Sequence, residues 1–237
     1  MSIVDRYRKN TSGRDLIVGD IHGHFTKLQQ ALDAASFNPE VDRLFGVGDL
    51  VDRGPESDQA LEWLAKQWFR TVAGNHEDMA IRWPNGNMDA QNYVANGGGW
   101  NVESTPAKQR QFADAFSALP IAIELETESG LVGIVHADCP FLHWGDFVTA
   151  LKDTSVSNNK RRAVIMDAQW SRDRITGALD GDIAGVRAVV VGHTPVQRFA
   201  SLDNVLYIDT GAWLPTHRGT GFFTLLDAAT LAPVRAH

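Results

Sequence analysis

Seven side chains that could bind a metal ion follow short apolar runs in the sequence. Each run, such as "DLIV" (15–18) or "RLFGV" (43–47), stops at a small polar cluster. The seven are Asp20, His22, Asp49, Asn75, His76, His136 and His193. They offer oxygen or imidazole nitrogen and no thiol, which suits Mn, Fe or Zn and argues against a structural zinc site. Asp20 and His22, two residues apart on an extended segment, point the same way and could hold one ion together.

The alternative to a metal site is that each of these residues has a separate structural role. A single Asp after a strand is usually a turn residue or a helix cap, and a single His is usually hydrogen-bonded or on the surface. However, five of the 8 histidines fall at or just after the end of an apolar run, within a turn of small residues. Independent explanations for all of them are improbable, so the sequence predicts one shared metal site.

The apolar runs have the length and the glycine boundaries of buried strands. Six are expected, at 15–18, 43–47, 69–73, 131–135, 187–191 and 205–208. Ligands of open α/β sheets gather beyond the carboxyl ends of the strands, where every polar cluster lies.

Amphipathic stretches between these runs predict helices. Apolar residues recur at helical spacing over 25–35, 61–68 and 112–119. Ser57 and Asp58 are candidate caps for the second helix, and Pro120 closes the third. Strands that alternate with helices indicate an α/β fold.

Composition limits the class of protein. The chain has 237 residues, with no internal repeat and no low-complexity linker, so one domain over 1–237 is expected. The formal net charge of −7 argues against a nucleic-acid partner. Cys139 is the single cysteine, which excludes an internal disulfide and a Cys-rich zinc site, and we expect it to be structural.

The start of the chain, "MSIVDRYRKN", is charged and unlike a secretory signal. No stretch approaches the ~18 consecutive apolar residues of a spanning helix. The sequence therefore predicts a cytoplasmic protein without a membrane partner.

Five blocks of the sequence resemble, in order and spacing, the signature blocks of the PPP-type metallophosphoesterases. They are "GDIHG" (19–23), "GDLVDRG" (48–54), "GNHE" (74–77), "HAD" (136–138) and "GHT" (192–194). Three further blocks make the chain most similar to the bacteriophage lambda-type and bacterial serine/threonine phosphatases: "NGGGW" (96–100), "QWSRDRI" (169–175) and "YIDTGA" (207–212). The resemblance spans roughly residues 14–213. It implies a calcineurin-like fold, a central β-sandwich flanked by helices in four αββα layers.

The resemblance also implies two divalent metal ions, with Mn expected and Fe or Zn as alternatives. The ligands would be Asp20 and His22 for the first ion, Asp49 for both, and Asn75, His136 and His193 for the second. Physical reasoning supports this assignment, because a carboxylate has two oxygens and Asp49 can join two cations about 3.5–4 Å apart. Asn75 is neutral, which suits an ion that already receives the charge of Asp49.

Four residues would act on the substrate. The resemblance implies that His76 would be the general acid for the leaving alkoxide, oriented by Asp52, and that Arg53 and Arg172 would hold the phosphate. A His beside a carboxylate stays protonated near neutral pH, and the planar guanidinium of arginine matches phosphate oxygens.

The expected function is a phosphomonoesterase that uses direct attack of a metal-bridging hydroxide on phosphorus. Its substrates would be proteins or peptides phosphorylated on serine or threonine, with phosphotyrosine and aryl phosphates as further substrates. A dinucleoside polyphosphate hydrolase is the alternative, which Asp52 in "VDRG" and the "NGGGW" block disfavour. A catalytically inactive binding module is less favoured still, because every expected ligand is present. The "NGGGW" block itself could form a rim near the metals or a tight turn between helices.

Overall fold

Two β-sheets packed face to face form the centre of the protein in the computed structural model, which describes residues 2–155, 158–216 and 220–234. The larger sheet has the spatial order β1 (Val4–Tyr7), β5 (Ala122–Thr127), β6 (Gly130–Val135), β7 (Ala188–Val191), β9 (Val205–Tyr207) and β8 (Ala200–Leu202). The smaller sheet has the order β11 (Ala232–Pro233), β10 (Leu225–Asp227), β2 (Asp15–Val18), β3 (Arg43–Gly46) and β4 (Phe69–Thr71). Strands β2, β3 and β4 run parallel, as do β6, β7 and β9.

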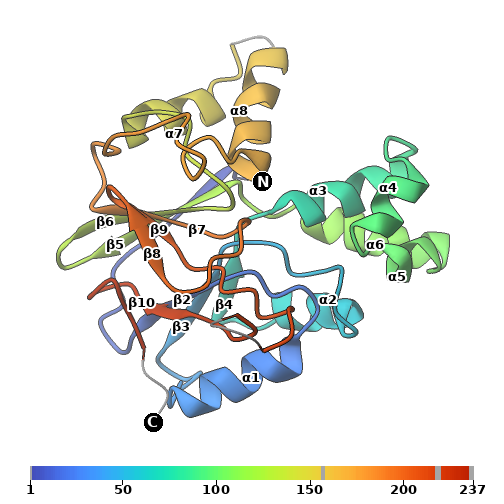
Figure 1. The fold of residues 1–237 in the computed structure, drawn as a ribbon, viewed down its shortest axis with the longest axis horizontal. Helices are drawn as coiled ribbons and strands as arrows, with labels where there is room; N and C mark the ends of the chain where they lie inside the picture. Colours follow the sequence, from blue (N-terminus) through green and yellow to red (C-terminus); the bar gives the residue numbers. More distant parts are fainter. Residues whose placement is uncertain (1, 156–157, 217–219, 235–237) are drawn as a thin grey trace.

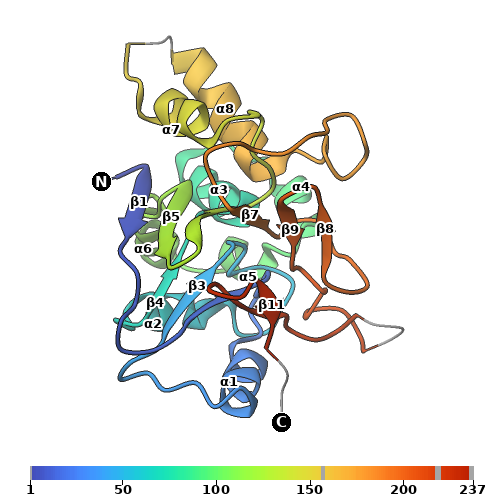
Figure 2. The ribbon, with the colours of Figure 1, turned by 90° about the vertical axis from the view of Figure 1, so that its left-hand side faces the viewer.

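Helices cover the outer face of each sheet, which gives four layers. Helices α7 (Trp144–Lys152) and α8 (Asn158–Trp170) lie over the larger sheet, and α1 (Phe25–Ala34) and α2 (Ala60–Leu64) lie over the smaller one (Figures 1 and 2). The predicted αββα arrangement is therefore confirmed. Within the described residues no helix combines the length and the apolar character needed to cross a bilayer.

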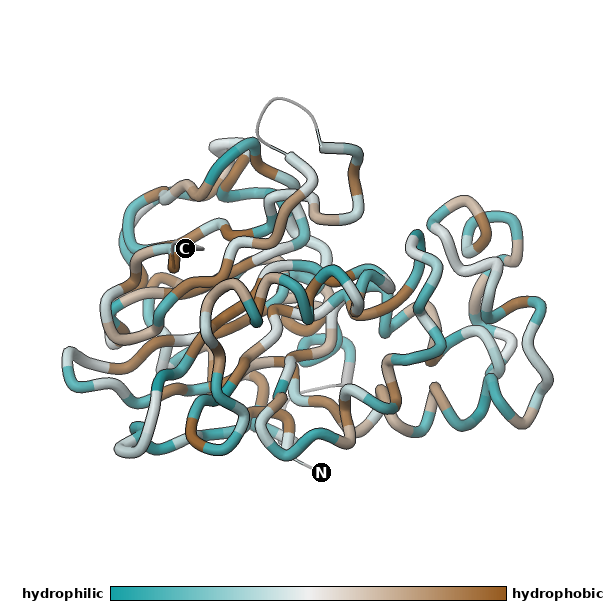
Figure 3. The backbone as a smooth tube through the Cα atoms, turned by 90° about the horizontal axis from the view of Figure 1, so that it is seen from below, coloured by the Kyte–Doolittle hydropathy of each residue, from teal (hydrophilic) through white to brown (hydrophobic). Residues whose placement is uncertain are grey.

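Alternation along the strands distributes apolar side chains between the layers. Leu16 and Val18 of β2 pack towards the helices, whereas Ile17 between them packs into the inter-sheet core. Phe45 of β3 and Ile134 of β6 are fully buried in the same inter-sheet core. In Figure 3 the hydrophobic segments accordingly concentrate along the central strands.

A helical lobe extends to one side of the sheets. It contains α3 (Asn75–Arg82), α4 (Ala90–Ala95), α5 (Gly99–Val102) and α6 (Pro106–Phe116) (Figure 1, right). Helix α6 begins at a typical helix start signal, because the Thr105 side chain caps it and proline occupies its first turn. Helix α3 packs against α6 and connects this lobe to the end of β4.

The six predicted strands are all present, as β2, β3, β4, β6, β7 and β9. The helix expected over 61–68 is shorter than predicted, since α2 ends at Leu64 and the chain then turns into β4. The prediction that Ser57 and Asp58 cap this helix was wrong. Both belong to a short 3₁₀ helix (Ser57–Gln59), and Ser57 Oγ instead accepts a hydrogen bond from the backbone N–H of Asp52 at 2.9 Å.

The inter-sheet core predicts a large cost for truncating Phe45. We expect Phe45→Ala to lower the free energy of unfolding by about 3–5 kcal/mol, because a cavity remains between two sheets that cannot close onto it. Urea denaturation followed by circular dichroism measures this change. The matched control is Leu142→Ala at a side chain 55% exposed, which should change stability by less than about 0.5 kcal/mol. Equal effects of the two substitutions would contradict the assignment of the core.

Candidate metal and phosphate site

The seven predicted donors meet at one edge of the sandwich, beyond the carboxyl ends of the parallel strands. The loops after β2, β3 and β4 approach from the smaller sheet, and those after β6 and β7 approach from the larger one. Each of the seven side chains is buried, and the most exposed of them, His193, is only 6% accessible. Residues up to 173 positions apart in the sequence thus line one small space, as the contact of His193 with Asp20 shows.

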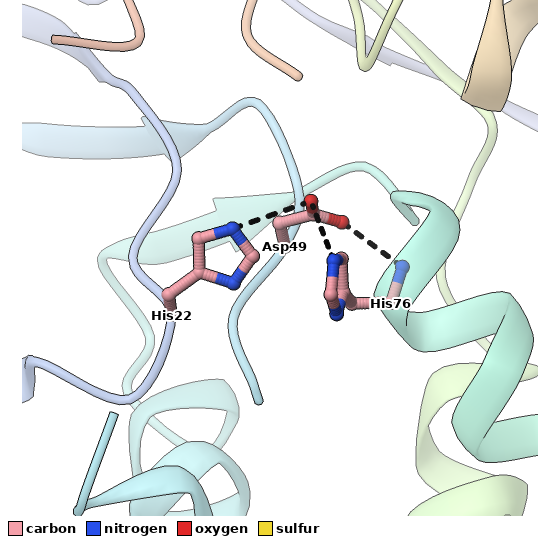
Figure 4. A group of neighbouring side chains, drawn as sticks. All are labelled: His22, Asp49 and His76. Atoms are coloured by element: carbon pink, nitrogen blue, oxygen red, sulfur yellow. Dashed lines mark hydrogen bonds and ion pairs between the residues drawn. The ribbon is translucent and has the colours of Figure 1, made fainter. Parts of the chain in front are cut away.

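Asp49 occupies the centre of this space, with a different set of partners for each carboxylate oxygen. Oδ2 lies 3.6 Å from Nε2 of His22 and 3.8 Å from Nε2 of His76 (Figure 4). Oδ1 lies 3.3 Å from Nε2 of His136 and accepts the backbone N–H of His76 at 3.0 Å. Burial would raise the pKa of Asp49, but the surrounding imidazoles outweigh it and hold the pKa well below its usual value. Asp49 is therefore an anion that faces two clusters of donors.

One cluster is formed by the donors predicted for the second metal. Oδ1 of Asn75 lies 2.9 Å from Nε2 of His136 and 2.8 Å from Nδ1 of His193, and the two imidazole nitrogens are 3.2 Å apart. Burial and the neighbouring His136 lower the pKa of His193 to about 3, so this imidazole is neutral. For His136 burial acts in the same direction, but Asp49 prevails and raises its pKa to about 10. A cation bound here would displace that proton.

The other cluster places His76, which was expected to be the general acid, beside the expected metal ligands His22 and Asp49. The ligand atoms of His22, Asp49 and His76 lie within 4.8 Å of one another. Asp20 is adjacent, with Oδ2 at 3.9 Å from Nε2 of His22, and both its oxygens accept the backbone N–H of His193 at 3.1 Å. Burial and the proximity of His76 lower the pKa of His22 well below its usual value, so His22 is also a neutral donor.

These residues fit divalent metal ions. Nε2 of His193 is buried and has no hydrogen-bond partner among the described residues, which is unusual for a buried polar atom. Neutral imidazoles, carboxylates and an amide oxygen form the donor set of a hard to borderline cation.

The sequence left one contact unresolved, that between Asp52 and His76, 24 residues apart. In the structure Oδ2 of Asp52 lies 2.6 Å from Nδ1 of His76, and the carboxylate is fully buried. Burial raises the pKa of Asp52, while hydrogen bonds from His76 and Trp100 oppose that rise. Because Nδ1 faces Asp52, Nε2 of His76 is the nitrogen that faces Asp49 and the site.

Arg53 and Arg172 differ in their surroundings. The exposed Arg53 places Nη1 2.7 Å from Nε2 of His22, and its guanidinium stacks on the ring of Trp213 with 4.3 Å to the centroid. Arg172 is also exposed, and its positive charge contributes to the low pKa of His193. The nearby Arg174 is buried and pairs with the equally buried Asp138 at 3.2 Å.

The "NGGGW" block was expected to form either a rim near the metals or a tight turn between helices, and in the structure it does both. It forms the turn between α4 and α5, and it also lies at the rim of the site. The carbonyl of Gly97 accepts the backbone N–H of Arg53 at 3.4 Å, and Nε1 of Trp100 donates to Oδ1 of Asp52 at 2.7 Å. A Cβ atom on Gly97 would lie 2.4 Å from the nitrogen of Arg53, so this approach requires glycine.

Sequence reasoning missed Glu77, which supports the centre of the site. Its fully buried carboxylate accepts three backbone N–H groups, from Asp49 at 2.9 Å, Leu50 at 2.8 Å and Gly74 at 2.8 Å. Burial, followed by the charge of Asp49, raises its pKa to about 7. The spacing from Gly74 to Glu77 is that of a capping box at the start of α3, a signal that could have revealed part of this role.

Backbone strain is concentrated in the same loops. Left-handed φ angles occur at His22 (45°), Asp49 (51°), Asp52 (70°), Arg53 (68°) and His193 (65°). Such angles in residues other than glycine cost on the order of 1–3 kcal/mol each and cluster at functional sites.

Comparison with known proteins agrees with this geometry. The family model described as "Calcineurin-like phosphoesterase" matches residues 14–197. The chain belongs to this family and is a hydrolase that acts on phosphoesters. The resemblance to the lambda-type and bacterial serine/threonine phosphatases is thereby confirmed.

Particular relatives refine the comparison. The chain is 36% identical over 204 residues to serine/threonine-protein phosphatase 2 of Salmonella typhimurium, covering 83% of this chain and 87% of the relative. It is 46% identical to the symmetrical bis(5'-nucleosyl)-tetraphosphatase of Erwinia tasmaniensis, but over 63 residues, covering 26% of this chain and 23% of that one. A solved structure described as a candidate diadenosine tetraphosphatase superposes with a TM-score of 0.65 at 21% identity, covering 99% of this chain and 97% of that one, which shows the shared fold.

Glu77→Gln tests the support of the central loop. One carboxylate oxygen becomes an N–H₂ group that faces backbone N–H donors, so we expect unfolding to become easier by about 1–3 kcal/mol. Because Asp49 loses an anchor, Mn²⁺ affinity measured by titration calorimetry should fall as well. The control is Asp78→Asn on the same helix, where a partly exposed pair with Arg82 should contribute less than about 1 kcal/mol. Unchanged stability and affinity in Glu77→Gln would exclude this role.

Proposed function

We propose that this protein is a metal-dependent serine/threonine protein phosphatase. The observation that carries the proposal is the buried Asp52–His76 pair beside Asp49. An alkoxide is a poor leaving group that needs a proton, and serine and threonine phosphates release alkoxides. The similarity to the Salmonella phosphatase along most of both chains supports the same substrate class.

Two divalent cations, with Mn as the proposed metal, would be held by Asp20, His22, Asp49, Asn75, His136 and His193. When bound, such ions polarise the phosphoryl group and lower the pKa of a water molecule. Asp49 is suited to serve both ions because its two oxygens face different clusters.

The remaining roles belong to protein side chains. Arg53 and Arg172 would bind the phosphate oxygens, and the stacking of Arg53 on Trp213 restricts the orientation of its planar guanidinium. His76 would donate the Nε2 proton to the leaving oxygen, since its Nδ1 is bonded to Asp52. Asp52 stabilises the protonated imidazole and keeps it in this orientation.

A dinucleoside polyphosphate hydrolase remains the second candidate, because of the structural similarity to the candidate diadenosine tetraphosphatase. Two observations favour the phosphatase. The sequence match to the tetraphosphatases covers about a quarter of the chain. A nucleotide is also a stable leaving anion that needs a general acid less than an alkoxide does, which makes the Asp52–His76 pair less necessary.

We further propose that residues 1–237 form one catalytic domain, that the protein acts in the cytoplasm, and that its partners are phosphorylated proteins or peptides rather than nucleic acid. The net charge of −7 supports the proposal that nucleic acid is not a partner, because an acidic protein repels the phosphate backbone.

Hydrolysis of a phosphoserine peptide with Mn²⁺ tests the mechanism. We expect His76→Asn to lower kcat by about 10²–10⁴-fold, because the general acid is lost. Asp49→Asn should also lose Mn²⁺ affinity, since the carboxylate between the two clusters is removed. His143→Asn, at an exposed histidine that caps α7, is the control and should retain wild-type kcat. Wild-type turnover in both site variants would refute the mechanism.

Substrate preference is tested by measuring kcat/KM for a phosphoserine peptide and for diadenosine tetraphosphate under identical Mn²⁺ concentrations. The peptide should be preferred by at least about tenfold, which corresponds to about 1.4 kcal/mol of transition-state stabilisation. A preference of this size for the nucleotide would replace the proposed function by the second candidate.

A further inference from the structure

Trp100 contacts the general-acid pair from outside the metal site. Its Nε1–H donates to Oδ1 of Asp52 at 2.7 Å, while Oδ2 of the same carboxylate lies 2.6 Å from Nδ1 of His76. The three residues form one chain of side-chain hydrogen bonds from the helical lobe to the site. Because the contact joins residues 48 positions apart, it depends on how the lobe is docked.

The surroundings of Trp100 hold its indole in place. The ring packs edge-on against Phe112 of α6, with 4.8 Å between centroids. The turn before it is tightly packed, since a Cβ atom on Gly98 would lie 2.2 Å from the ring of Tyr93. Gly97 in the same turn approaches the backbone of Arg53, as described above. The indole N–H therefore occupies a defined position relative to Asp52.

A carboxylate bonded through one oxygen can turn about its Cβ–Cγ bond and tilt its partner. Asp52 is fully buried, so loss of the indole donor would also remove a hydrogen bond from a buried charged group. With Trp100 on Oδ1, Oδ2 is directed at Nδ1 of His76, and Nε2 is directed into the site. We propose that Trp100 is a positioning residue that sets the orientation of the general acid through Asp52.

This inference rests on the general-acid role of His76 in the proposed function. During hydrolysis the bond between phosphorus and the leaving oxygen breaks, and its electron pair stays on that oxygen. The oxygen takes the Nε2 proton of His76, while the oxygen of one water molecule bonds to phosphorus. One proton of that water restores the imidazolium through the solvent, and the other stays on the phosphate. Proton donation matters for a basic leaving group such as ethoxide or phenolate and little for the weakly basic 2,4-dinitrophenolate, so Trp100 should control the dependence of rate on the leaving group.

The experiment compares kcat/KM of Trp100→Phe and wild type on ethyl phosphate, phenyl phosphate and 2,4-dinitrophenyl phosphate at saturating Mn²⁺. Phenylalanine keeps an aromatic ring against Phe112 and removes the N–H donor. We expect a loss of about tenfold on the ethyl and phenyl esters and of less than about twofold on the dinitrophenyl ester. His76→Asn should show the same order of esters with larger losses.

Trp83→Phe is the matched control, because Trp83 lies in the same lobe and its buried Nε1 has no hydrogen-bond partner among the described residues. It should leave the rates on all three esters unchanged. Trp100→His keeps a ring N–H in a smaller ring and should recover part of the loss on phenyl phosphate. Equal losses in Trp100→Phe and Trp100→His would overturn the proposal, as would a loss of the same size on all three esters or no loss on any.

A double-mutant cycle tests whether the effect passes through Asp52. In an Asp52→Asn background, Trp100→Phe should cause no further loss on phenyl phosphate, and an additive loss would refute the pathway. The three esters are small molecules, so this comparison does not depend on a protein substrate. An enzyme that cleaves the esters but not phosphoserine peptides would fail the proposed function and leave the test of Trp100 intact.

Discussion

The buried carboxylate of Glu77 is the interaction on which the rest of the site depends. It accepts backbone N–H groups from both the loop after β3 and the start of α3, and so joins the two segments that carry Asp49 and His76. The backbone of Asp49 is left-handed, a conformation that surrounding interactions must maintain. Without this support the strained loop could relax to backbone conformations of lower energy, and the carboxylate of Asp49 would lose its position.

Charge balance is the second constraint on the site. Asp49 remains ionised in a buried environment because imidazoles surround it, and burial keeps His22 and His193 neutral. This arrangement places a fixed anion beside neutral imidazoles and beside His136, whose proton a cation would displace, which is a favourable environment for a divalent cation. The fold achieves it by bringing the ends of strands from two sheets to one edge, so that each sheet contributes ligands.

The helical lobe supports the site although it supplies none of the expected metal ligands except Asn75 at the start of α3. Its turn at residues 96–100 touches Asp52 and Arg53, which lie in one loop and are proposed to serve proton transfer and phosphate binding. Trp213, from another segment of the chain, stacks on the guanidinium of Arg53. The charged loop after β3 is thus held by aromatic and backbone contacts from distant segments, which limits its freedom before substrate binds.

The sequence by itself determined six of the strands, the α/β class and the types of donor at the strand ends, because these follow from local periodicity, glycine boundaries and residue chemistry. The αββα layering was expected from the resemblance of the sequence blocks to a known family. The sequence did not indicate β1, β5, β8, β10 and β11. Four of these strands are four residues long or shorter, and all but β11 include charged or hydroxyl side chains, so their pairing depends on neighbours in the sheet. Only the tertiary structure decided that Asp52 meets His76, that Trp100 bonds Asp52, and that Arg174 is buried while Arg172 is exposed. Those contacts join residues of distant segments, and their geometry is set by the packing of whole elements, which no local pattern encodes.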